Sequence, residues 1–197
     1  MKSLSYFILC LYLLSVSVLP TNAASAKSPP VKYDRIVMGV AFSALNELHI
    51  VGADIDNDEH LRWAVWSQKS AQGMMVKLAL LKNTATGPVV LYTLERKDAY
   101  EPDIKRIINW RYGKHPVLAL TYHYGAAAEQ VELYGLAHND QPVRLDQRSG
   151  EVVGWGISSG GEALLGIYTK PEGRLKPTWY RWHEESHALV QTTNPAE

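Results

Sequence analysis

Short apolar segments separated by turn-forming residues recur along the chain from residue 35 onward. Most have the length of a strand, are rich in Val, Ile, Leu, Tyr and Trp, and several alternate apolar with polar positions. The segments are 35–42, 48–53, 61–67, 75–81, 89–94, 107–110, 117–124, 131–136, 143–145, 152–157, 163–168, 178–182 and 188–191. This pattern predicts an all-β domain. Only residues 97–108 leave room for a helix, which Pro102 restricts.

Two stretches of the chain follow the same course of strands. The first is 107–110, 116–122, 131–136 and 142–145, and about 45 residues later the second is 153–155, 162–168, 178–182 and 188–191. An earlier copy with longer loops is 50–53, 61–67, 76–81 and 88–94. A period in the forties with four short strands per unit is typical of β-propeller blades. The sequence therefore predicts a propeller-like arrangement of about three four-stranded antiparallel units.

Three units are fewer than the four or more blades of a closed propeller. The sequence leaves three arrangements open. In the first, residues 33–42 contribute to an additional partial blade. In the second, the sheets pack as an open, propeller-like wedge. In the third, two chains close one ring.

The N-terminus has the three parts of a secretory signal peptide. Lys2 precedes an apolar run over 6–19, and small residues occupy 21–26. Pro20 ends the run after about fourteen residues, short of the roughly twenty that span a bilayer, and Cys10 lies inside the run, which does not suit a lipoprotein. We expect cleavage after Ala26, with Ala23 as the alternative. The predicted organisation is a signal peptide over 1–26, a short tether over 27–32 and a single β-repeat domain over 33–197.

Composition limits how the mature domain is stabilised and which partners it binds. Cys10 is the only cysteine, so cleavage removes it and the domain must be stabilised by an apolar core rather than by disulfides. The chain has no formal net charge, which does not favour binding to nucleic acid or to an anionic membrane. We expect a periplasmic protein without a membrane anchor, with an extracellular location as the alternative.

An acidic loop lies within the first unit. Residues 51–65 resemble the FG-GAP type of propeller blade, in which an acidic loop joins two strands and often holds calcium. Asp54, Asp56 and Asp58 would supply three carboxylates at alternate positions, and calcium requires six or more oxygen ligands. An EF-hand is excluded by Glu59 at the sixth loop position. The alternatives are a calcium site and a solvated acidic turn with no cofactor.

Residues 183–187 match the H-E-x-x-H pattern of zinc peptidases, which requires a helix to place both imidazoles on one face. The flanking segments alternate like strands, and the repeat places the motif on a hairpin turn. We therefore predict a turn between strands. The mature chain also lacks a cysteine nucleophile and a G-x-S-x-G elbow. We assign no catalytic residue and expect a protein that is not an enzyme.

The leading hypothesis is a non-catalytic domain that binds another protein through its loops. The candidate contact residues are Ser158, Ser159 and Gly160 in a glycine-flanked loop, and His123 and Tyr124 on a strand near a loop. A calcium- or carbohydrate-binding β module, using the Asp54 loop or the aromatic strand faces, is the alternative. A zinc-dependent peptidase is the third hypothesis.

The predicted mature protein is small, exported by a signal peptide, rich in β-strands and without catalytic residues. In these features it resembles periplasmic immunity proteins. Those proteins protect Gram-negative bacteria from cell-wall-degrading type VI effectors. The resemblance implies a partner such as a periplasmic hydrolase or effector. It also implies a loop, such as the one at Ser158 and Ser159, that enters the cleft of the effector.

Overall fold

The computed structural model describes residues 45–53 and 60–193, all of which belong to the compact unit Tyr33–Glu197. The predicted signal peptide, the tether and the segment 35–42 lie outside the described residues. No helix long and apolar enough to cross a membrane occurs within the described ranges.

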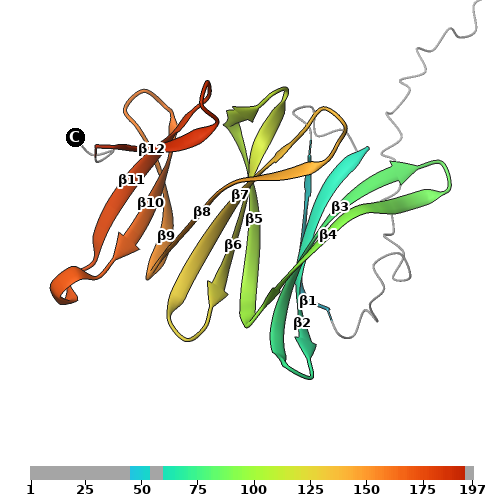
Figure 1. The fold of residues 1–197 in the computed structure, drawn as a ribbon, viewed down its shortest axis with the longest axis horizontal. Helices are drawn as coiled ribbons and strands as arrows, with labels where there is room; N and C mark the ends of the chain where they lie inside the picture. The colour runs from blue at the N-terminus through green and yellow to red at the C-terminus, as the bar shows by residue number, and fades with distance from the viewer. Residues whose placement is uncertain (1–44, 54–59, 194–197) are drawn as a thin grey trace, which may run out of the picture. The chain divides into compact units, whose positions relative to one another are not determined.

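Within residues 45–53 and 60–193, twelve strands form three four-stranded antiparallel sheets (Figure 1). The first sheet contains β1 (Leu45–Gly52), β2 (Leu61–Ser70), β3 (Gly73–Thr84) and β4 (Gly87–Lys97). The second contains β5 (Ala99–Tyr112), β6 (His115–Tyr124), β7 (Ala128–Leu136) and β8 (Pro142–Gly150). The third contains β9 (Val152–Ile157), β10 (Ala163–Thr169), β11 (Lys176–His183) and β12 (Ala188–Thr192), with a short 3-10 turn, η2 (Pro171–Gly173), before β11.

The predicted all-β class and the three units are confirmed, and each sheet is made of four strands consecutive in the chain. Residues 97–108, where the sequence leaves room for a helix, lie mostly in strand β5. Pro102 is tolerated there because β5 is an edge strand among the described strands and its pairing with β6 skips from Tyr100 to Asp103. Proline therefore displaces no ladder hydrogen bond.

The second sheet is buried on both faces, which makes it the middle layer of the stack. On β6, Leu118 and Leu120 pack against the first sheet, whereas Val117 and Ala119 pack against the third. Alternate residues of a strand point to opposite faces, so a continuous apolar run is what a strand in this position requires. Among the described residues no hydrophobic cluster joins the first sheet to the third. The three units therefore form an open, propeller-like stack.

The outer face of the third sheet is covered by its own aromatic side chains. Trp179 pairs across the strands with Gly166, and its ring would lie 2.8 Å from a Cβ at that position. Tyr168 meets Trp179 edge to face, with ring centroids 6.1 Å apart. With its indole over Gly166 and against Tyr168, Trp179 is 9% exposed.

Candidate functional site

A bulge in β5 forms the centre of the candidate site. Pairing with β6 skips from Ile107 to Arg111 on β5 while advancing a single residue on β6. The extra residues let both Ile107 and Trp110 point into the core between the second and third sheets. Ile108 and Asn109, which lie between them, are turned to solvent. Bulges of this kind re-aim side chains next to binding sites.

The bulge is held firmly against the third sheet through Trp110. Its indole Nε1 donates a hydrogen bond to the Ala163 carbonyl at 3.1 Å. Its ring stacks on that of Trp182 at 5.9 Å between centroids and contacts Trp155 at 5.8 Å. A buried tryptophan with a satisfied N–H fixes the backbone on either side of it, so the exposed bulge residues sit on a rigid base.

A groove of about 450 Å³ runs between β5 and β9 beside this bulge, and we refer to it as the β5–β9 groove. Two isoleucines on its walls are unusually exposed, Ile108 at 51% and Ile157 at 70%. Its lining residues are Lys105, Arg106, Ile107, Ile108, Asn109, Trp155, Gly156, Ile157, Gly161 and Ala163. A second hollow of about 360 Å³ lies between β1 and β5 and shares Arg106 and Ile108 with the groove. Both hollows therefore lie beside strands that come first in their sheets, namely β5 and β9 for the groove and β1 and β5 for the second hollow.

Lys105 places a positive charge over the aromatic wall of the groove. Its Nζ lies 5.0 Å from the centroid of the Trp155 ring, a cation–π arrangement. With Lys105 over its ring and Trp110 against it, Trp155 offers the groove less open aromatic surface than a free indole would.

The turn from Ser158 to Glu162 closes one end of the groove. Ser158 N donates to the Glu162 carbonyl at 2.8 Å, and Glu162 N donates to Ser158 Oγ at 3.0 Å. Gly161 N donates to the Ser158 carbonyl at 2.9 Å, and Gly161 has a positive φ that suits glycine. Ser158 thus holds the turn in place, while the predicted contact residues Ser159 and Gly160 are exposed at its tip.

His123 and Tyr124, the other predicted contact residues, lie at a different place on the second sheet. His123 pairs with Tyr100 near the start of β5, stacks on its ring at 5.4 Å, and has its Nε2 3.5 Å from Glu101. Tyr124 is 51% exposed and pairs with Ala99. The groove begins farther along β5, at Lys105. The structure therefore does not bring the two predicted groups into one site.

The predicted turn at residues 183–187 is confirmed, because this segment is the hairpin between β11 and β12. His183 Nδ1 lies 2.9 Å from Ser186 Oγ, and the His187 ring contacts Tyr112 at 4.7 Å between centroids. Within residues 45–53 and 60–193, no three His, Cys, Asp or Glu side chains gather as metal ligands would. Asp54, Asp56 and Asp58 lie outside the described residues, so the calcium site stays a prediction.

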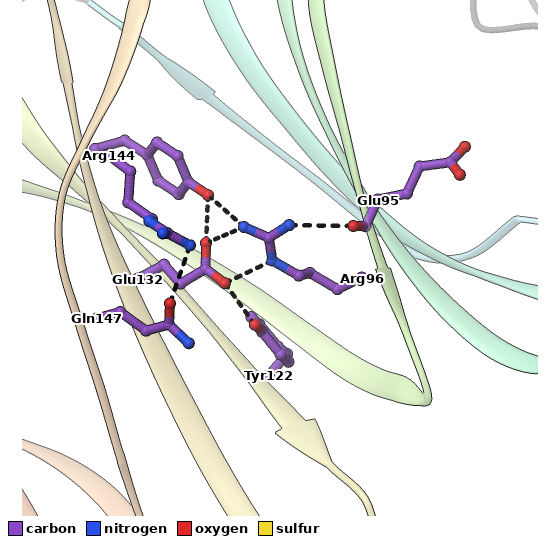
Figure 2. A network of polar contacts seen from close by, with 7 residues as sticks. Glu95, Arg96, Tyr122, Glu132, Arg144 and Gln147 are labelled. Atoms are coloured by element: carbon purple, nitrogen blue, oxygen red, sulfur yellow. Dashed lines mark hydrogen bonds and ion pairs between the residues drawn. The ribbon is translucent and has the colours of Figure 1, made fainter.

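A buried carboxylate links the first sheet to the second (Figure 2). Glu132 on β7 is fully buried, and its Oε1 and Oε2 accept hydrogen bonds from Arg96 Nε at 2.6 Å and Nη2 at 2.7 Å. Tyr122 donates to Oε1 at 2.6 Å, and Tyr134 donates to Oε2. Each carboxylate oxygen already accepts two donors, so the group is suited to holding the sheets together and has little capacity left for a ligand.

The same contacts set the ionisation of the cluster. Burial by itself would raise the pKa of the Glu132 carboxyl, but the hydrogen bonds from Arg96, Tyr122 and Tyr134 together hold that pKa below its usual value. Burial, and then hydrogen bonding to Glu132, raise the pKa values of Tyr122 and Tyr134. The hydrogen bond to Glu132 raises the pKa of Arg96. The native cluster is one carboxylate, one guanidinium and two neutral phenols.

The cluster predicts how stability depends on pH. The lowered pKa of Glu132 stabilises the fold fully above 4.5, the usual value, and that contribution is lost as pH falls through the lowered pKa. The raised pKa values of Tyr122 and Tyr134 stabilise the fold below 10.0, and this contribution is lost as pH rises further. Urea midpoints measured against pH should show a plateau between these limits. The acid decline should be shallower in Glu132→Gln, and an unchanged acid decline would contradict this account.

Sequence patterns found only part of this site. The glycine-flanked loop at Ser158 to Gly160 was predicted, but the groove beside it was not, because Ile108, Trp155 and Ile157 resemble ordinary strand residues. One signal was present: Ile107 and Ile108 are adjacent and cannot both face one side of a regular strand. The buried role of Glu132 had no sequence signal of its own.

Comparison of the chain with protein-family models, with curated proteins and with solved structures finds no match.

Proposed function

We propose that this chain is a non-catalytic protein-binding domain whose contact surface centres on the β5–β9 groove. The observation that carries the proposal is the pair of exposed isoleucines, Ile108 and Ile157, on opposite walls of one groove. Exposed apolar side chains that gather around a hollow are common where proteins dock, whereas isolated ones need no explanation.

The rigidity of the surroundings supports this role. Ile108 projects from a bulge anchored by Trp110, and Ile157 precedes a turn fixed by three hydrogen bonds around Ser158. A surface that is ordered before binding loses little conformational entropy on contact, so more of the contact energy appears as affinity. Polar neighbours such as Lys105 and Asn109 would form the rim around the apolar centre.

In biological terms, the proposal is a periplasmic inhibitor or immunity protein that blocks a cell-wall-degrading effector. The exposed tip of the turn, Ser159 and Gly160, is small and narrow, which suits insertion into the cleft of a partner enzyme. Ile108 and Ile157 would then pack on the rim of that cleft.

The test is quantitative co-purification from periplasmic extract of the producing cells. We expect one protein to be recovered in equal amount with the native domain. Ile108→Asp or Ile157→Asp should each reduce its recovery by about tenfold or more, as the loss of a central apolar anchor does. Val89→Asp is the matched control, because Val89 is 46% exposed on β4 and lies outside the groove.

Thermal unfolding of each variant checks that the fold is intact. Recovery of no stoichiometric protein would contradict the proposal, as would equal losses in the groove variants and in Val89→Asp.

A carbohydrate-binding module is the alternative function, with Trp155 as the stacking platform. It is less well supported, because Lys105 already lies over the Trp155 ring and Trp110 packs against it. Titration with soluble cell-wall fragments, followed by calorimetry, separates the two functions. Saturable heat that Trp155→Ala abolishes would favour the carbohydrate module.

A further inference from the structure

Strand β9 forms one edge of the third sheet (Figure 1). It pairs with β10 on one side, and among the described strands none pairs with it on the other. We refer to this unpaired side, over residues 154–157, as the β9 edge. Trp155, Gly156 and Ile157 in this stretch also line the β5–β9 groove. An unpaired strand edge presents backbone N–H and C=O groups to which another extended chain can bind.

Two hydrogen bonds fix the direction of the backbone groups of β9. Val153 N donates to Glu129 Oε2 on β7 at 2.7 Å, so this N–H points away from β10. Ser158 N, just beyond β9, donates to the Glu162 carbonyl, just before β10, at 2.8 Å. Backbone groups alternate between the two sides of a strand. The odd-numbered residues of β9 therefore direct their N–H and C=O to the open side, and the even-numbered residues direct theirs to β10.

The backbone groups available at the β9 edge are those of Trp155 and Ile157. The N–H of Val153 is already bonded to Glu129, and β9 ends at Ile157. An extended segment lying along this edge would pair with the N–H and C=O of both residues, as in β-strand addition. The β9 edge is therefore short, and the hydrogen bonds at its two ends define where such a segment pairs.

The side chains around the β9 edge define the chemistry of that segment. Trp155 packs into the core between the second and third sheets, and Ile157 lies on the same face of β9. Residues paired with them would share this face, toward Ile108 and Lys105 on β5. An apolar side chain opposite Ile157 would pack between the two exposed isoleucines. A carboxylate opposite Trp155 would meet Lys105, whose Nζ lies 5.0 Å from the centroid of that ring.

We propose that the partner contributes an extended segment that adds to the β9 edge as an antiparallel strand of the third sheet. The segment carries an apolar side chain opposite Ile157 and a carboxylate opposite Trp155. Charge supports the carboxylate, because the charged residues that line the groove, Lys105 and Arg106, are both basic. This inference rests on the proposed function, since it specifies how the partner occupies the β5–β9 groove.

The test uses the peptide acetyl-Thr-Val-Thr-Ile-Thr-Glu-Thr-amide, whose isoleucine and glutamate have the spacing that the proposal requires. The peptide is titrated into the isotope-labelled full chain, and amide hydrogen exchange is followed by NMR. We expect the amide protons of Trp155 and Ile157 to exchange about tenfold more slowly once about nine-tenths of the sites are occupied. The amides of Val153 and Ser158 should change little, because they are already hydrogen-bonded.

Two matched peptides separate backbone pairing from side-chain contact. The same peptide with an N-methylated isoleucine lacks one donor of the pairing strand and should give no protection. The same peptide with lysine in place of glutamate should bind more weakly, because its charge repels Lys105. On the protein side, Lys105→Gln should weaken binding of the glutamate peptide by up to about fivefold, the contribution of an exposed ion pair. Lys114→Gln, an exposed lysine outside the groove, should leave it unchanged.

Four results would overturn the inference. The first is no protection of Trp155 and Ile157 by the glutamate peptide. The second is equal protection by the N-methylated peptide, and the third is equal binding of the lysine peptide. The fourth is slow exchange of both amides before any peptide is added, which would show that the edge is already paired; dependence of that protection on protein concentration would identify a second copy of the chain.

The two proposals fail in different experiments. A folded partner can dock on Ile108 and Ile157 without pairing to β9, so a negative peptide result leaves the proposed function standing. Recovery of no stoichiometric partner in the co-purification would contradict the proposed function, whatever the peptide does.

Discussion

Replacing Glu132 by alanine is expected to lower the free energy of unfolding by about 4 kcal/mol, because it leaves the Arg96 guanidinium and two phenols without their shared acceptor. The Arg96 side chain is only 24% exposed, so water cannot fully replace the lost contacts. Urea-induced unfolding followed by tryptophan fluorescence measures the change.

Two variants bracket this prediction. Glu132→Gln keeps the volume and part of the hydrogen bonding, so it should cost less than alanine. Glu95→Gln breaks the surface ion pair of Glu95 with Lys77, a 2.8 Å contact in which Glu95 is half exposed, and should cost less than about 1 kcal/mol. Equal losses in Glu132→Ala and Glu95→Gln would show that the buried cluster does not hold the sheets together.

Gly150→Ala is expected to destabilise the domain by about 3 kcal/mol, although it adds a single methyl group. A Cβ at Gly150 would lie 2.5 Å from the Tyr168 carbonyl oxygen and 2.9 Å from Ile167. That carbonyl accepts a hydrogen bond from Glu151 N at 2.8 Å, which fixes its position where β8 meets β10. The third sheet must shift to make room, and calorimetry should record a lower midpoint of thermal unfolding.

Gly160→Ala is the matched control for this crowding. A Cβ at Gly160 would meet nothing nearer than Ser158 Oγ at 3.7 Å, an ordinary contact distance. Its thermal midpoint should therefore stay close to that of the native protein. A midpoint for Gly150→Ala as high as that of Gly160→Ala would mean that the two sheets are not packed as tightly as the structure places them.

The three sheets were predictable from the sequence because each strand pairs with strands that are adjacent to it in the chain. Strand-length apolar segments at a regular period, such as 117–124 and its counterpart 163–168, pair with sequence neighbours, and no long-range information is needed to group them. The continuous apolar run at Val117 to Leu120 even indicates a strand buried on both faces.

Contacts between sheets were not predictable in the same way. Glu132 alternates with apolar residues on β7 as a solvent-facing residue would, and the opposite charge that accompanies its burial, on Arg96, comes from the neighbouring sheet. The β5–β9 groove likewise depends on a register shift near Trp110 that no single segment encodes. Of the predicted contact residues, the turn at Ser158 lies beside that groove, whereas His123 lies on β6, opposite the start of β5.

The strictly sequential order of strands also has a consequence for how the chain folds. Every described ladder joins strands that are adjacent in sequence, so each sheet is a meander that closes only short loops. Contacts of long sequence separation arise when the meanders dock, as between Arg96 and Glu132 or between Trp182 and the Arg111 carbonyl. The rate-limiting barrier should then lie in docking preformed meanders, and the folding rate should be faster than expected for an all-β chain of this size.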